Sequence, residues 1–348
     1  MPTSPGIIDL HADTPLWMRW LGYDVVREHP SPPLPRAAWG GHLDVPRMLR
    51  GGMGAQFFGL VGVPFLDRRL YATVHRQAEL VEAAITRSGG TLVAARSAED
   101  LARAHAEGRI AALLGIEGAH SLEGDADNLD RLAAHGVRYL GLLHFSANEA
   151  GFPAFGRGRD DAQGLTPWGR ALVERCDALG VIVDLAHVNR RGFFDALEIT
   201  RNPVYVTHTG VTGVHAHWRN LDDEQILAVA RGGGATGIIF APRFLGRDGV
   251  EAVVDHVAHV VKVAGEDTPC LGSDWDGMIV PTRGLEDAAQ LPTLVEALGR
   301  RLPARVVDKV VRGNALRVVA SVAPKAPVQG VWAQPWPALT PPARPAGT

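Results

Sequence analysis

Histidine and acidic residues stand at the ends of apolar segments in this sequence. The first such segment, GIIDLHAD at 6–13, ends in His11 and Asp13, whose side chains would point to the same face of a strand. Imidazole and carboxylate groups are both ligands that zinc accepts. An isolated His-x-Asp is more often an ordinary polar pair, so the rest of the chain must decide between a metal site and that alternative.

Five further apolar segments end in residues of the same kind. They are 110–118, 137–144, 180–187, 203–208 and 269–277, with Glu117, His144, His187, His208 and Asp274 at or near their ends. In a barrel of parallel strands, active sites form where the carboxyl ends of the strands meet. Chance would scatter such residues over helices and loops as well, so the pattern favours a metal site.

Five of these side chains form the candidate ligand set: His11, Asp13, Glu117, His187 and His208. Three imidazoles and two carboxylates are too many for one tetrahedral zinc with an open position, but they suit two ions that share a carboxylate, for which Glu117 is the natural bridge. Two such ions lower the pKa of a shared water and stabilise a developing oxyanion. Asp274 would then accept the proton from that water. Asp184 is a candidate acceptor for the second ring N–H of a ligating histidine.

The apolar segments also predict the fold. Together with 54–63 and 235–242 there are eight, and helix-patterned stretches such as 76–89, 169–180, 223–233 and 250–265 lie between them. Near-continuous apolar runs are typical of parallel strands that are covered on both faces. Eight strands with intervening helices predict an α/β fold of the (β/α)8 TIM-barrel type. We expect the barrel domain to span residues 1–320 and a Pro- and Ala-rich irregular tail to span 321–348.

The composition is that of an ordinary globular protein. The 348 residues are 46% hydrophobic and 21% charged, with a net charge of −3. This charge offers no basis for binding nucleic acid or an anionic membrane, and no apolar run reaches the length of a membrane span. Two cysteines cannot build a disulfide framework, and no basic stretch followed by an apolar one opens the chain. We expect a cytoplasmic protein without nucleic-acid or membrane partners; whether it forms a homo-oligomer stays open.

Seven motifs between residue 7 and about residue 317 carry a resemblance to a known family. They are DLHADTP, GIEGAHSL, VRYLGLLHFSAN, GLTPWGRALVERCDALGVIVDLAHVN, VTHTGVTGVHAHWRNLDDEQI, LGSDWDG and GNALRV. With these motifs the chain resembles the membrane (renal) dipeptidase family, zinc peptidases among the amidohydrolase-like metal-dependent barrels. The resemblance implies two Zn²⁺ per chain and hydrolysis of small dipeptides with a free C-terminal carboxylate, including L-Ala-D-Ala-like dipeptides with a D-residue at that end.

The resemblance also implies roles for individual residues. It gives one zinc to His11, Asp13 and Glu117, and the second to Glu117, His187 and His208. It makes His144 the group that stabilises the tetrahedral oxyanion, Arg219 the anchor for the substrate carboxylate, and Asp274 the residue that deprotonates the bridging water. Two motifs depart from the family pattern without changing a candidate ligand: THTG at 207–210 replaces the common Ser-His-Ser order, and DLAH at 184–187 replaces DLSH.

Two alternative functions stay open. One is another amidohydrolase-type reaction, on a cyclic amide, a lactone or a biosynthetic dipeptidyl conjugate. The other is a metal-bound scaffold without turnover, against which the complete ligand set together with Asp274 argues. Other residues near the motifs are expected to have supporting or structural roles; they are His120, His256, His259 and Asp276. His215 and His217 are expected to be loop or rim residues that can contact the substrate.

Overall fold

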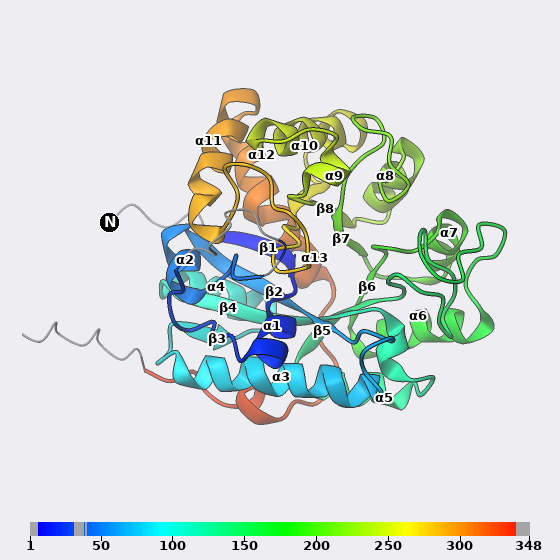
Figure 1. Ribbon diagram of the computed structural model, residues 1–348, viewed down its shortest axis with the longest axis horizontal. Coiled ribbons are helices and arrows are strands. Elements are labelled where there is room, and N and C mark those ends of the chain that lie inside the picture. The colour runs from blue at the N-terminus through cyan, green and yellow to red at the C-terminus, as the bar shows by residue number, and fades with distance from the viewer. Residues whose placement is uncertain (1–5, 31–37, 39, 339–348) are drawn as a thin grey trace, which may run out of the picture.

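Parallel strands form a closed barrel in the computed structural model, which describes residues 6–30, 38 and 40–338 (Figure 1). The strands are β1 (Ile7–Ala12), β2 (Met53–Val61), β3 (Leu92–Ala94), β4 (Ile110–Glu117), β5 (Val137–Gly141), β6 (Ile182–Asp184), β7 (Tyr205–Thr209), β8 (Ala235–Ile238) and β9 (Pro269–Leu271). They lie in the order β2-β1-β9-β8-β7-β6-β5-β4, and a pairing of β2 with β4 closes the ring. The predicted eight-stranded barrel is thereby confirmed.

The short strand β3 is an addition that the sequence pattern did not predict. It pairs with residues 110–112 of β4, on the edge opposite β2, while β5 pairs with residues 114–116 of that same edge. Strand β3 therefore lies end to end with β5 and is not one of the eight barrel strands.

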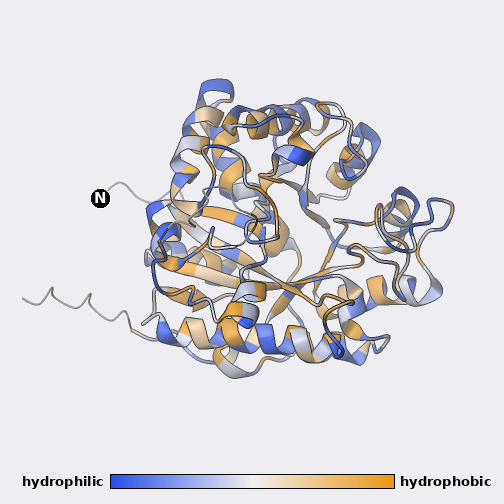
Figure 2. Cartoon of the chain, viewed as in Figure 1, coloured by the Kyte–Doolittle hydropathy of each residue, from blue (hydrophilic) through white to orange (hydrophobic). Residues whose placement is uncertain are grey.

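Helices cover the outside of the barrel. They are α1 (Thr14–Leu21), α2 (Val45–Arg50), α3 (Leu70–Arg87), α4 (Ala98–Ala106), α5 (Asp127–Ala134), α6 (Pro167–Leu179), α7 (Arg190–Ile199), α8 (Asp223–Arg231), α9 (Pro242–Leu245), α10 (Val250–Ala264), α11 (Leu291–Arg301), α12 (Ala304–Asp308) and α13 (Asn314–Ser321). The four predicted helical segments are α3, α6, α8 and α10. The strands are mostly apolar, whereas the helices carry both apolar and hydrophilic residues, as expected for a layer between core and solvent (Figure 2).

Packed side chains fill the barrel interior, and helix α13 closes one end of it. Phe57, Tyr139 and Tyr205 are fully buried in one apolar cluster with residues of α13. The Tyr205 hydroxyl donates a hydrogen bond to the carbonyl oxygen of Ala315, the second residue of α13, at 2.8 Å. The opposite end, where the strands have their carboxyl termini, is left for a site.

The described part of the predicted tail lies against the barrel. Helix α13 ends at Ser321, the first residue of the predicted tail. Further on, Trp332 donates a hydrogen bond to Glu82 of α3, and the guanidinium of Arg103 lies 3.7 Å from the ring centre of Trp336. Residues 339–348 lie outside the described residues, and the domain boundary stays a prediction. In the described part of the chain, no helix combines the length and the apolar character needed to cross a membrane.

Candidate metal centre and active site

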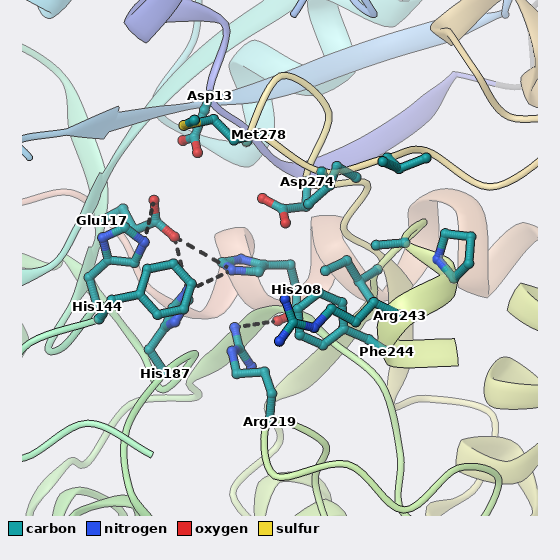
Figure 3. A pocket seen from close by; sticks show the side chains of 17 residues that line it. Asp13, Glu117, His144, His187, His208, Arg219, Arg243, Phe244, Asp274 and Met278 are labelled. Atoms are coloured by element: carbon teal, nitrogen blue, oxygen red, sulfur yellow. Dashed lines mark hydrogen bonds and ion pairs between the residues drawn. The ribbon is translucent and has the colours of Figure 1, made fainter. Parts of the chain in front are cut away.

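A cavity of about 400 Å³ opens at the carboxyl ends of the strands (Figure 3). Seven of the eight predicted site residues line it: Asp13, Glu117, His144, His187, His208, Arg219 and Asp274. The eighth, His11, is fully buried and contacts three of these acidic side chains. The volume is within the range of small-molecule sites. The barrel thus brings together residues that are spread over more than 260 positions of sequence.

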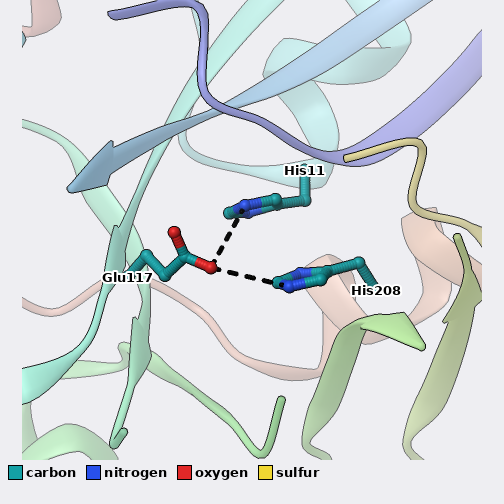
Figure 4. A group of neighbouring side chains, drawn as sticks. All are labelled: His11, Glu117 and His208. Carbon is teal, nitrogen blue, oxygen red and sulfur yellow. Dashed lines mark ion pairs between the residues drawn. The ribbon is translucent and has the colours of Figure 1, made fainter. Parts of the chain in front are cut away.

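Glu117, the last residue of β4, is the centre of the cluster. Its Oε1 lies 3.0 Å from His187 Nε2, 3.5 Å from His208 Nε2 and 3.6 Å from His11 Nε2. Figure 4 shows the imidazoles of His11, from β1, and His208, from β7, facing this carboxylate. His187 Nε2 and His208 Nε2 are only 2.9 Å apart, and His11 Nε2 lies 3.4 Å from Asp13 Oδ1. Three ring nitrogens therefore converge on one carboxylate.

Three buried polar atoms of this cluster lack a hydrogen-bond partner among the described residues: His11 Nε2, Asp13 Oδ1 and Glu117 Oε2. Buried polar atoms without a partner are costly and rare. Three triplets have ligand atoms within 4.8 Å of one another: His11, Glu117 and His208; Glu117, His144 and His187; His11, Asp13 and Asp274. The residues present therefore fit a metal cofactor, and the triplets bring His144 and Asp274 next to the predicted ligands.

The charges of the cluster also favour a cation. Burial raises the pKa of Glu117 well above its usual value and that of Asp274 to about 8. Burial works against a charged His11, but the carboxylates of Asp13 and Glu117 outweigh it and raise the pKa of His11 to about 10. Burial lowers the pKa of His187 well below 6.5, so its imidazole is neutral and can present a lone pair.

Two hydroxyl groups hold the histidines from behind. The Tyr139 hydroxyl, from β5, lies 2.7 Å from His11 Nδ1. Thr207 Oγ1 lies 3.0 Å from His208 Nδ1 and donates to Asp184 Oδ2 at 2.8 Å. Asp184, the predicted acceptor, therefore acts on a histidine through Thr207 and not directly. Sequence reasoning did not single out Tyr139; the available signal was a tyrosine in an otherwise apolar strand, whose hydroxyl needs a partner.

Two glycines leave the space that these side chains occupy. A Cβ on Gly115 of β4 would lie 2.0 Å from the Tyr139 ring. A Cβ on Gly59 of β2 would lie 2.6 Å from Asp13 Oδ1 and 2.8 Å from His11 Cε1. Any larger residue at either position would displace the groups around the metal centre.

Left-handed backbone turns direct two site residues into the cavity. His187 has φ +67° and lies three residues beyond β6, and Asp274 has φ +61° three residues beyond β9. Such values are uncommon for residues other than glycine and cluster at functional sites. Asp276, two residues after Asp274, accepts hydrogen bonds from Thr14 Oγ1 and the His42 backbone N–H, which ties this turn to α1 and the following loop.

Arg219 and His144 complete the lining of the cavity. Arg219 is buried and donates from Nη2 to the carbonyl oxygen of His208 at 2.8 Å. Burial lowers its pKa to about 10, so it stays charged at neutral pH. His144 lies in the loop after β5, with Nε2 3.6 Å from Glu117 Oε2.

The other histidines near the motifs have partners within the protein. The Nε2 of His120 lies 2.7 Å from the carbonyl oxygen of Gly62. The buried His256 accepts from the Val211 backbone N–H, and His259 pairs with Asp223 at 2.7 Å. The rings of His215 and His217 stack on each other at 6.1 Å in the loop before Arg219. All of these lie outside the three triplets.

Comparison with known proteins identifies the family. The family model for membrane dipeptidases, peptidase family M19, matches residues 3–328. Dipeptidase tcpJ of Claviceps purpurea (strain 20.1) is 32% identical over 296 residues, which cover 81% of this chain and 69% of that protein. The crystal structure of dipeptidase AC, a metallo peptidase, superposes with a TM-score of 0.80 at 27% identity, covering 92% of this chain and 99% of the other. A metallo peptidase from Rhodobacter sphaeroides, liganded with a phosphinate mimic of the dipeptide L-Ala-D-Ala, gives a TM-score of 0.79 at 26% identity, covering 91% and 99%. The chain therefore belongs to the membrane dipeptidase family, peptidase family M19, and is a hydrolase.

Proposed function

We propose that this protein is a binuclear zinc dipeptidase. Its substrates would be small dipeptides with a free C-terminal carboxylate, including those with a D-residue at that end. The observation that carries the proposal is the convergence of three imidazoles on Glu117. It is supported by the buried polar atoms of His11, Asp13 and Glu117 that have no hydrogen-bond partner among the described residues. Substrates with a D-residue are supported by the family member that binds a mimic of L-Ala-D-Ala.

In this proposal the five side chains around Glu117 hold the metal. His11, Asp13 and Glu117 would hold one zinc, and Glu117, His187 and His208 the other. Imidazole nitrogens and carboxylate oxygens are the donors that catalytic zinc accepts. When bound, the two ions polarise the scissile carbonyl and lower the pKa of the attacking water.

Two further side chains of the cavity would handle the proton and the developing charge. Asp274 reaches the metal cluster from the loop after β9, with Oδ1 3.8 Å from His11 Nε2. It accepts the proton from the attacking water and can return it to the leaving amine. His144 reaches the cluster from the loop after β5, and its ring lies edge-on to His187 at 4.8 Å. Its Nε2–H donates a hydrogen bond to the oxygen that becomes negative in the tetrahedral intermediate.

Arg219 would select substrates that have a free C-terminal carboxylate. Among the described residues, the Arg219 guanidinium donates one hydrogen bond, to the carbonyl oxygen of His208. Its other N–H groups can therefore bind a carboxylate. Because Arg219 is buried beside the metal cluster, the carboxylate it holds must be close to the scissile bond. Such a position would favour dipeptides over longer peptides.

The test is a substrate panel with the zinc-loaded enzyme. We expect hydrolysis of L,L and L,D dipeptides, and poor hydrolysis of their C-amidated, N-acetylated and cyclic analogues. Elemental analysis of the active protein should find two zinc ions per chain. Equal rates on free acids and C-terminal amides would overturn the dipeptidase proposal in favour of a broader amidohydrolase, and one ion in fully active protein would overturn the binuclear one.

A further inference from the structure

A second arginine, Arg243, lies on the same cavity as Arg219. It is the second residue of α9, which follows β8, and it lines the cavity. Figure 3 shows its side chain extending from α9 to the side of the cavity where Arg219 lies. Among the described residues, no hydrogen bond or ion pair involves Arg243. Arg247, four residues along, is by contrast paired with Asp255 of α10.

Helix α9 is fixed to the loop that carries Arg219. The Asn220 side chain donates to the carbonyl oxygen of Phe244 at 2.8 Å, and the rings of His217 and Phe244 meet edge-on at 4.9 Å. The His217 imidazole is close enough to both guanidinium groups, those of Arg243 and Arg219, to be affected by their charge. After burial, the positive charges of Arg243 and Arg219 are among the causes that lower its pKa to about 4. The two arginines therefore belong to one structural unit beside the cavity.

The cavity offers Arg243 no acidic partner of its own. The acidic side chains that line it are Asp13, Glu117 and Asp274, and all three belong to the metal cluster. The wall around Arg243 is apolar, formed by Ile239, Ala241, Pro242 and Phe244. Arg243 is exposed at the cavity, and a guanidinium there without a protein anion is free to pair with a carboxylate that arrives with the ligand.

We propose that Arg243 binds the side-chain carboxylate of the substrate's C-terminal residue, so that dipeptides ending in Asp or Glu are preferred. This inference rests on the proposed dipeptidase function. With the α-carboxylate on Arg219, the side chain of the same residue leaves from the adjacent Cα and can extend along the wall toward α9. The small side chain of Ala241 leaves room for its methylene groups, and the carboxylate meets the Arg243 guanidinium at the mouth.

The test compares a charged side chain with its neutral isostere. The zinc-loaded enzyme is assayed with Ala-Glu and Ala-Gln, each with the L and the D form of the second residue. We expect kcat/KM for the preferred Ala-Glu isomer to exceed that for Ala-Gln by about 10-fold, as for one charge-assisted contact. Arg243→Met should bring this ratio to about one, mainly through KM for Ala-Glu, and should leave Ala-Gln almost unchanged.

Two further variants keep the test specific. Arg247→Met removes the same charge four residues along the chain but outside the cavity lining, and it should keep the preference for Ala-Glu. Arg243→Glu should reverse the preference, so that Ala-Lys gains over Ala-Glu. Equal kcat/KM for Ala-Glu and Ala-Gln in the native enzyme, or an unchanged ratio in Arg243→Met, would refute the subsite while leaving the dipeptidase proposal in place. If neither dipeptide nor Ala-Ala is hydrolysed, both proposals fall.

Discussion

Replacing Tyr139 by Phe removes one hydroxyl and tests how His11 is held for metal binding. The hydroxyl lies 2.7 Å from His11 Nδ1, and both side chains are fully buried. If Nε2 is the metal ligand, Nδ1 carries the proton and donates it to the Tyr139 oxygen. Without that oxygen, the ring can rotate or adopt the other tautomer, in which an N–H and not a lone pair faces the cavity.

The expected loss of zinc affinity is that of removing one hydrogen bond, the one between the Tyr139 hydroxyl and the predicted ligand His11. Removing such a contact typically weakens metal affinity about 10–100-fold, which corresponds to about 1.4–2.7 kcal/mol. Tyr205→Phe is the matched control, because Tyr205 is equally buried in the barrel and its hydroxyl bonds to Ala315 O, away from the site. Each variant should lose about 1 kcal/mol of folding free energy with its hydrogen bond. Only Tyr139→Phe should lose metal affinity.

The assay is competition for zinc between the metal-free protein and a chromophoric chelator. Denaturant unfolding of the same metal-free samples measures the free energy of unfolding, which separates lost affinity from lost stability. Equal zinc affinities for Tyr139→Phe and Tyr205→Phe would refute the reasoning that His11 is a ligand oriented from behind by Tyr139.

Four further changes have defined outcomes. Arg219→Met should cost about 2–4 kcal/mol in kcat/KM on free dipeptides, mostly through KM, and little more on their methyl esters, which already lack the contact. Steady-state kinetics on both substrate classes measures this, and an equal loss on esters would contradict it. Asp274→Asn should lower kcat about 10²–10⁴-fold while substrate still binds, because the proton acceptor is lost. Glu117→Gln should purify with fewer than two zinc ions by elemental analysis, because the shared ligand loses its charge. Burial lowers the pKa of His256 from 6.5 to about 4. Between these pH values His256 is therefore protonated in the unfolded chain and neutral in the folded one. His256 alone should therefore lower the free energy of unfolding by about 2–3 kcal/mol as the pH drops from 6.5 to 4, and His256→Asn should remove this part of the decline in denaturant unfolding.

The strands and the convergence of the site residues could be predicted from the sequence because both follow from local patterns. Buried parallel strands are apolar throughout, and barrel topology places the residue after each strand at one mouth. His11, Glu117 and His208 stand within or at the end of strands, so their positions follow from the strands alone. The comparisons confirm the family that the motifs indicated, whereas the individual roles of the site residues stay predictions.

The features that could not be predicted depend on contacts between distant segments. Tyr139 reaches His11 across 128 residues of sequence, past the space left by Gly115. Arg243 meets the cavity only because α9 packs on the loop of Arg219, and nothing in the local sequence APRFLG distinguishes it from a surface arginine. Propensity and periodicity carry no information on such pairs, because they describe neighbours along one element.

The candidate metal centre also affects the stability of the barrel. Asp13, Glu117 and Asp274 are buried within one cavity, and two left-handed turns add backbone strain next to them. Without a cation, burial raises the pKa of Glu117 and Asp274, so at neutral pH the protein must either keep carboxylic acids neutral or bury unpaired charge. Either choice lowers the free energy of unfolding, and cation binding to the folded state would recover it. The side chains that fit a cation therefore lower the stability of the metal-free fold, and the glycines at 59 and 115 leave the space that this crowded arrangement needs.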